Sequence, residues 1–201
     1  KKNMIKNLNT LNNKKDIFIE NIIIGSGAGG ATTAFELSKQ KKECIVLEDG
    51  PNVNNLDFSN IGRSIAKLYK NNGATPLVSN NGGPIIGYGQ GSCIGGSTYV
   101  NAGYFSNTPE WIFNNWIKQN KTIIEFSHYK KLIDEIKSEI EVNVEHLTSL
   151  DNDSKILHEK SKKINWKIEK CERFSSGIVG NEKQNMNTTY LKKIAENGVD
   201  I

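Results

Sequence analysis

Arginine and cysteine are both scarce in this 201-residue chain, and each scarcity excludes a class of protein. Only two of the 26 basic residues are arginines, Arg63 and Arg173, and the net charge is only +4. Nucleic-acid-binding surfaces favour clustered arginine, so no nucleic-acid partner is predicted. The three cysteines, Cys44, Cys93 and Cys171, are widely spaced and form neither a CxxC metal pair nor a disulfide framework.

Long apolar runs are also missing. The longest, Ile17 to Ile24, is interrupted by Glu20 and Asn21 and is too short to span a bilayer. Basic residues stand at the start of the chain, but no apolar segment follows them, so no signal peptide is predicted. These absences predict a soluble, cytoplasmic protein without a metal centre or a transmembrane segment.

The residues that are present favour a globular α/β protein. Hydrophobic residues make up 36% of the chain, enough for one domain with a core. The apolar run Ile19–Ile24 predicts a buried parallel strand, covered on both faces, and Cys44–Leu47 predicts a second one. Between them a glycine-rich turn leads into a helix over residues 31–39. This is a β–turn–α–β unit of about 30 residues.

The rest of the chain is less regular. Residues 52–92 are rich in glycine and asparagine and show no long periodic segment, which predicts an extended loop. Apolar periodicity predicts helices over residues 110–144, and the alternation in residues 164–168 predicts a half-exposed strand. A helix over residues 188–196 is then followed by the opening of a third strand at 199–201.

The first motif is the G-x-G-x-x-G run at residues 25–30. A buried strand precedes it and a helix follows, the context in which this motif binds a dinucleotide. Gly25 permits the tight turn, Gly27 lets a diphosphate approach the backbone, and Gly30 lets the helix pack on the strand. The N–H groups at the start of the helix would bind the diphosphate.

An acidic residue completes this motif. Glu48 follows Gly30 by 18 residues, close to the roughly 20 expected for the acid that binds the ribose hydroxyls. Its charge argues against NADP but leaves NAD and FAD open. The predicted cofactor-binding residues of this region are Gly25, Ser26, Gly27, Ala28, Gly29, Gly30, Glu48 and Asp49.

A second glycine motif distinguishes between FAD and NAD as the predicted cofactor. Residues 95–102 read Gly-Gly-Ser-Thr-Tyr-Val-Asn-Ala, and residues 45–50 read Ile-Val-Leu-Glu-Asp-Gly. Together with the first motif, these runs resemble the glucose–methanol–choline oxidoreductases. The resemblance extends more faintly through Thr108–Trp111 and Trp116 to the Lys-Gln-Asn-Met-Asn-Thr-Thr-Tyr-Leu run at 183–191, which is similar to long-chain and sterol alcohol oxidases.

The resemblance implies a cofactor, a reaction and further site residues. The cofactor would be FAD, held without a covalent bond, because Val100 stands where some members carry a linking histidine. Gly95, Gly96 and Ser97 would lie against the flavin and diphosphate, and Asn101 near the isoalloxazine ring; Ala102 is also predicted to bind the cofactor. The reaction would be oxidation of a CH–OH group, with the hydride passing to the flavin. The alcohol and the electron acceptor are left open.

No catalytic residue can be named. The family's base is a histidine far along the chain, and none of His128, His146 and His158 matches its motif; we interpret them as surface residues. Cys93 is interpreted as a small packing residue, and Trp111, Ile112, Phe113 and Trp116 as core residues.

The predicted fold is an FAD-binding Rossmann-like α/β domain, incomplete, with a mostly helical insertion that begins a substrate domain. Its expected divisions are an extension at 1–16, the FAD-binding core at 17–110, the insertion at 111–165 and a return segment at 166–201. The opening third strand suggests an excerpt whose first strand keeps an open edge and an uncovered apolar face. Two alternatives remain: a NAD-linked Rossmann dehydrogenase, and a non-catalytic FAD-binding subunit that needs a second chain.

Overall fold

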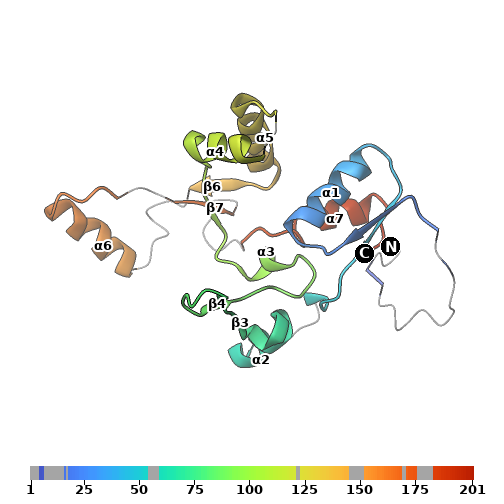
Figure 1. Ribbon diagram of the computed structural model, residues 1–201, viewed down its shortest axis with the longest axis horizontal. Coiled ribbons are helices and arrows are strands. Elements are labelled where there is room, and N and C mark those ends of the chain that lie inside the picture. Colours follow the sequence, from blue (N-terminus) through green and yellow to red (C-terminus); the bar gives the residue numbers. More distant parts are fainter. Residues whose placement is uncertain are drawn as a thin grey trace. The chain divides into compact units, whose positions relative to one another are not determined.

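The computed structural model describes residues 5–6, 16, 18–53, 59–120, 123–144, 152–168, 171–175 and 183–201. The chain forms two compact units, the first made of Lys1–Asn101 with Asn185–Ile201 and the second of Ala102–Gln184. Each unit combines helices with short strands, so the fold is mixed α/β (Figure 1). This confirms the predicted fold class in its broad terms.

The first unit is built around a β–α–β sequence. Strand β1 (Asn21–Ile24) runs parallel to β2 (Cys44–Leu47), and helix α1 (Ala28–Lys39) connects them. The prediction for β2 is confirmed in both bounds. The predicted first strand begins two residues later than expected, and the helix begins three residues earlier, directly after the glycine turn.

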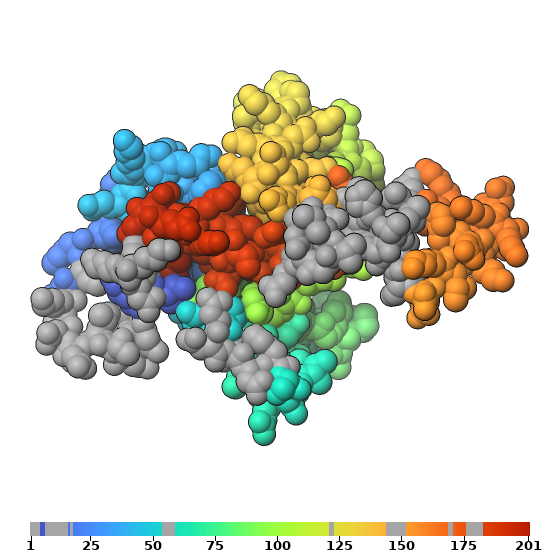
Figure 2. Space-filling view, turned by 180° about the vertical axis from the view of Figure 1, so that it is seen from behind, coloured from blue at the N-terminus to red at the C-terminus, as the bar shows by residue number. Residues whose placement is uncertain are grey.

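One face of this small sheet is closed by two helices. Helix α1 packs against α7 (Tyr190–Glu196), and the two lie side by side in Figures 1 and 2. Their shared core contains Phe35 stacked on Tyr190, with ring centroids 4.3 Å apart. The other buried residues of this layer are Ala31, Ala34, Val46, Leu191 and Ile194. The predicted helix near the end of the chain is therefore confirmed and supplies half of this layer.

The opposite face of the sheet is open in the described part of the chain. Side chains alternate between the two faces of a strand, and Ile22, Ile24 and Leu47 point away from the helices. They are 58%, 78% and 38% exposed, respectively. The first strand is thus covered on one face, whereas its composition predicts cover on both.

The end of the chain returns to the sheet. Asp200 forms a parallel bridge with Ile45, and the Val46 N–H donates to the Asp200 carbonyl at 3.1 Å. The predicted start of a third strand at 199–201 is confirmed as this single bridge. The bridge lies on the edge of β2 that does not pair with β1. Near the start of the chain, the Lys6 N–H donates to the Ile201 carbonyl and the Lys6 ammonium pairs with Asp200.

The loop predicted for residues 52–92 is wrong in part. Among the described residues it contains four elements: α2 (Ile61–Leu68), the short 3-10 helix η3 (Lys70–Gly73), and an antiparallel hairpin of β3 (Thr75–Leu77) and β4 (Ile86–Tyr88). These elements are short and mostly exposed, so they carry no long apolar period. Helix α2 starts at a local cap, where Asn60 Oδ1 accepts from the Arg63 N–H at 3.0 Å.

The second unit combines helices with one small sheet. Its elements are β5 (Tyr104–Phe105), α4 (Glu110–Asn120), α5 (Phe126–Glu139), β6 (Val142–Val144), α6 (Asn152–Lys163) and β7 (Glu172–Phe174). The strands are antiparallel in the order β5-β7-β6. The helical pattern predicted for residues 110–144 is confirmed by α4 and α5 but is wrong at its end, where residues 142–144 form β6; the three short strands were not foreseen.

Two predictions for the second unit are wrong. No strand forms at 164–168; the turn after α6 brings the Trp166 N–H to the Ser161 carbonyl at 3.0 Å, and Ile164, Trp166 and Ile168 are exposed. Among the residues that the structure describes, no strand lies beside this segment to pair with it. The second prediction, a core role for the apolar residues of α4, is wrong for Trp111 and Trp116, which are exposed, and confirmed for Phe113, which is buried against aromatic residues of α5.

Candidate functional site

The first glycine motif forms the turn from β1 into α1. Gly25 has a φ of +88°, which favours glycine, and its N–H donates to the Leu47 carbonyl at 2.7 Å. A Cβ placed on Gly30 would lie 1.9 Å from the Gly25 carbonyl oxygen. The roles predicted for Gly25 and Gly30, a tight turn and close helix–strand packing, are therefore seen directly.

The start of α1 suits an anion. Its N-cap is Gly27, no side chain caps the helix, and no acidic residue lies in its first turn. The first N–H groups of a helix lack partners inside the helix and carry the positive end of its dipole. Ala28 and Gly29 are exposed at this end. These features fit the predicted diphosphate position.

The second glycine motif lies directly on the first. Residues 93–96 are buried, and a Cβ placed on Gly96 would lie 2.9 Å from the Gly27 Cα. A side chain at Gly96 would therefore push the two backbones apart. Two segments that the sequence associated with one ligand are thus in backbone contact in the first unit.

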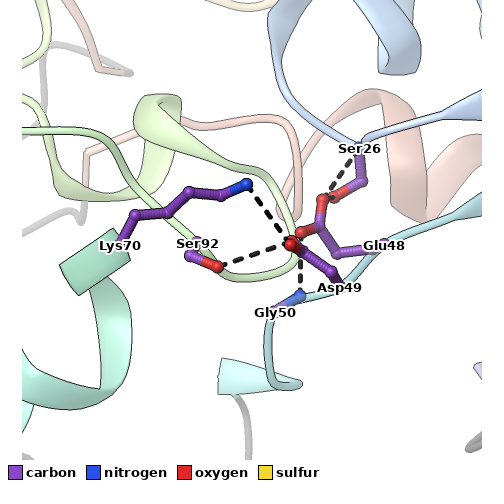
Figure 3. A network of polar contacts seen from close by, with 6 residues as sticks. All are labelled: Ser26, Glu48, Asp49, Gly50, Lys70 and Ser92. Carbon is purple, nitrogen blue, oxygen red and sulfur yellow. Dashed lines mark hydrogen bonds and ion pairs between the residues drawn. The ribbon is translucent and has the colours of Figure 1, made fainter.

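Glu48 lies between the end of β2 and the first motif (Figure 3). Its Oε2 accepts from the Ser26 N–H at 2.9 Å and from the Ser26 hydroxyl at 2.6 Å, and its Oε1 accepts from the Gly50 N–H at 3.0 Å. An ionised carboxylate has about four acceptor positions. These protein donors orient the carboxylate and leave an acceptor position that a hydroxyl group of a ligand could use.

Asp49 points to a different group of residues. Its carboxylate lies 3.3 Å from the Lys70 ammonium and accepts from the Ser92 hydroxyl at 3.4 Å (Figure 3). Hydrogen bonding from Lys70 is the main cause that holds the pKa of Asp49 below its ordinary value. Of the two adjacent acids predicted to bind the cofactor, only Glu48 contacts the first motif.

The remaining predicted residues are arranged around the short helix α3 (Ser97–Val100). The Ser97 hydroxyl accepts from the Gly91 N–H at 3.0 Å, so it supports the glycine segment from within. Asn101 is the C-cap of α3 and is exposed. Ala102 is the first residue of the second unit.

Two contacts at this site were missed in the sequence. The Thr98 hydroxyl donates to the Gly95 carbonyl at 2.6 Å and accepts from the Met186 N–H at 3.1 Å. Met186 is buried and belongs to the run at 183–191, which the sequence marked only as a family resemblance. Helices and strands leave a periodic apolar pattern in the sequence, whereas a single threonine that bonds to a distant segment leaves no such pattern.

The other candidates lie apart from the motifs. His128 is exposed, His158 is half-buried, and His146 lies outside the described residues. Cys93 is fully buried with Val53 and Leu68, which confirms it as a packing residue. In the part of the chain that the structure describes, no group of three potential metal ligands occurs, and no helix combines the length and apolar composition needed to cross a bilayer.

The fold and the site define a dinucleotide-binding α/β unit with two apposed glycine motifs. The sequence profile of the GMC oxidoreductases matches residues 20–201. The chain therefore belongs to the GMC oxidoreductase family, as the resemblance predicted. Members of this family bind FAD, which confirms FAD as the cofactor. The open start of α1, the close glycine backbones and the oriented Glu48 carboxylate fit such a group.

Individual relatives cover this chain well. An uncharacterised GMC-type oxidoreductase (y4nJ) of Sinorhizobium fredii is 27% identical, over 96% of this chain and 40% of the relative. Long-chain-alcohol oxidase FAO4B of Arabidopsis thaliana is 26% identical, over 90% of this chain and 25% of the relative. The chain thus spans less than half the length of these relatives.

A solved structure is similar at a lower level. It comes from a study of how a mutation affects FAD modification in the formate oxidase of Aspergillus oryzae. It aligns with a TM-score of 0.35 and 16% identity, over 49% of this chain and 18% of its own.

Proposed function

We propose that this chain provides the FAD-binding part of an oxidoreductase that oxidises the CH–OH group of an alcohol. The observation that carries the proposal is the backbone contact between the two glycine motifs, with Gly96 against Gly27. This contact lies beside the open end of α1 and the Glu48 carboxylate. A backbone without side chains at this point suits a cofactor that must approach closely.

Each part of the site has a proposed role. The N–H groups at the start of α1 bind the diphosphate, and Glu48 accepts a hydrogen bond from a ribose hydroxyl. Residues 95–97 line the flavin, and Asn101 stands near its ring, as the family resemblance implies. Asp49, which binds Lys70, supports the shape of the loop after β2.

Bound FAD would supply a two-electron acceptor for the hydride that leaves the alcohol carbon. The chain's own residues bind and orient the cofactor, and the buried glycine segment excludes water from one side of it. A base must also take the hydroxyl proton. None of the three histidines matches the family's catalytic motif, so no residue of this chain is assigned that role.

The substrate proposed is an alcohol of unspecified length. Two observations favour an extended apolar one: the relative FAO4B is named a long-chain-alcohol oxidase, and the run at 183–191 is similar to that of such oxidases. The attachment proposed is non-covalent, because Val100 offers no nucleophile for a flavin bond.

A second candidate is a non-catalytic FAD-binding subunit that works with another chain. The observation that favours it is the uncovered apolar face of the sheet at Ile22 and Ile24. Co-purification of a second polypeptide, together with alcohol oxidation only by the pair, would favour this candidate.

The test is spectroscopic. The purified protein is expected to show flavin absorbance and to release FAD into the supernatant on acid precipitation. Addition of an alcohol without oxygen should then bleach the absorbance in the catalytically complete protein. A colourless protein that binds NAD in a titration would overturn the proposal, and flavin that stays with the precipitate would overturn the non-covalent attachment.

A further inference from the structure

A continuous chain of hydrogen bonds crosses the first unit, from the end of β2 to the residues before α7. The Ser26 hydroxyl donates to Glu48 and accepts from the Gly95 N–H at 3.0 Å. The Thr98 hydroxyl donates to the Gly95 carbonyl at 2.6 Å and accepts from the Met186 N–H at 3.1 Å. Two hydroxyls therefore bind both backbone polar groups of one glycine.

This glycine lies where ordinary secondary structure offers it no partner. Gly95 and Gly96 have φ values of +92° and +55°, both are buried, and neither belongs to a helix or a strand. Buried backbone groups need hydrogen bonds, and a segment of this shape cannot join a ladder. The hydroxyls of Ser26, which is fully buried, and Thr98 supply these bonds.

The direction of each hydroxyl is set by its neighbours. A carboxylate only accepts, so the Ser26 hydrogen is directed to Glu48 and its lone pair faces the Gly95 N–H. A backbone N–H only donates, so the Met186 N–H donates to the Thr98 hydroxyl oxygen. The Thr98 hydroxyl hydrogen is therefore directed to the Gly95 carbonyl. Each side chain must both donate and accept, which excludes alanine, valine and the weakly bonding cysteine.

We propose that Ser26 and Thr98 are positioning residues that hold the second glycine segment against the first before the cofactor binds. They act through Gly95 and Glu48, whereas the first glycine motif predicts a direct cofactor contact for Ser26. The inference rests on the proposed FAD function of this site. Without either hydroxyl, the segment must be ordered at the moment of binding, and that cost weakens affinity.

The test compares Ser26→Ala, Thr98→Val and Thr98→Ser with two controls that remove hydroxyls bonded only within surface helices. In the controls, Ser64→Ala removes a hydroxyl that donates to the Asn60 carbonyl, and Ser38→Ala removes a hydroxyl near the far end of α1 that donates to the Phe35 carbonyl. The first measurement is amide hydrogen exchange in the purified protein without FAD. The second is the FAD dissociation constant from quenching of flavin fluorescence.

Faster exchange is expected at Gly95 in Ser26→Ala and at Met186 in Thr98→Val. The FAD dissociation constant is expected to rise about tenfold in both, the scale of one lost hydrogen bond to a buried group. Thr98→Ser keeps the hydroxyl and should retain wild-type exchange and affinity, as should both controls.

Other outcomes separate the two claims. Wild-type protein that binds no FAD would overturn the proposed function, while the exchange measurement would still test the hydrogen-bond chain. Exchange and affinity in Ser26→Ala equal to those of the controls would overturn the positioning role. If Ser26→Ala fails to fold, equal behaviour of Thr98→Val and Thr98→Ser would overturn it as well.

Discussion

The two faces of the β1–β2 sheet have similar composition and opposite surroundings. On the face toward α1 and α7, Val46 is fully buried and Cys44 is 5% exposed. On the other face, Ile24 is 78% exposed and Ile22 is 58% exposed. A strand with apolar residues on both faces has the composition of a strand covered on both sides. The composition of the second face therefore calls for a cover that the described residues do not provide.

The same contrast recurs at the end of β2. Glu48 turns toward the first glycine motif and is held by buried donors, whereas its neighbour Asp49 turns toward exposed Lys70. Both residues directly follow β2, and they differ in the burial of their partners, because Ser26 is buried and Lys70 is exposed. Substitutions at buried and exposed positions of the first unit should therefore differ in effect, and this difference can be measured.

The largest effect should come from the closed layer. Ile194 of α7 is fully buried, so Ile194→Ala is expected to lower the free energy of unfolding by about 3 kcal/mol, through lost burial and a cavity. The same substitution on the open face, Ile24→Ala, should change it by less than about 0.5 kcal/mol. Urea unfolding of both variants tests the comparison. Equal losses would show that Ile24 is covered in the protein as measured.

Two glycines of the first motif give the next contrast. In Gly30→Ala the added Cβ would meet the Gly25 carbonyl oxygen, so α1 must shift, at a cost of about 2 kcal/mol or more. Gly29→Ala places its Cβ in open space and should be neutral or stabilising by up to about 1 kcal/mol, because alanine favours a helix. Thermal unfolding without cofactor measures both. Similar melting temperatures for the two variants would contradict the packing role of Gly30.

The paired acids offer a smaller and more specific contrast. Glu48→Gln removes the charge that would strengthen a ribose hydrogen bond, so the FAD dissociation constant should rise about tenfold. Asp49→Asn changes a residue that binds Lys70 and should leave it within about twofold. Calorimetric titration with FAD distinguishes the two. An equal loss in both variants would assign Asp49 to the cofactor site as well.

The sequence predicted the parts of the fold that depend on local pattern. The glycine turn, both parallel strands and α7 follow from β-branched runs, a G-x-G-x-x-G spacing and an Asn-Gly helix stop. The residues of the first motif lie at the start of α1. Glu48 bonds to Ser26 of that motif, and Gly96 of the second motif packs against Gly27. The turn, the strands and the helix were predictable because each is encoded in a short run of consecutive residues, whereas the association of the two motifs came from the family resemblance.

The missed features depend on distant or exposed contacts. Helix α2 has only eight residues, and its apolar positions Ile61, Ile65 and Leu68 span just two turns, which is too short a periodic segment to stand out among the surrounding glycine and asparagine residues. The alternation at Ile164, Trp166 and Ile168 resembles that of a strand, but in the described part of the chain no strand pairs with it. The Thr98–Met186 bond joins residues 88 positions apart, and no pattern in one sequence encodes such a pairing.

The smallest expected effect concerns Asp49 and the pH. Lys70 lowers the pKa of Asp49 in the folded chain below the ordinary value of 3.8. The ionised carboxylate therefore stabilises the fold; this contribution is fully present above the ordinary pKa and is lost as the pH falls through the lower folded value. Because both side chains are substantially exposed, Lys70→Gln should lower the free energy of unfolding by no more than about 0.5 kcal/mol at pH 7 and low salt. Urea midpoints should differ at pH 7 and converge as the pH falls below the folded pKa of Asp49. They should also converge in about 1 M salt, where exposed pairs are screened. A difference that persists under both conditions would show that Lys70 stabilises the fold through its aliphatic stem and not through its charge.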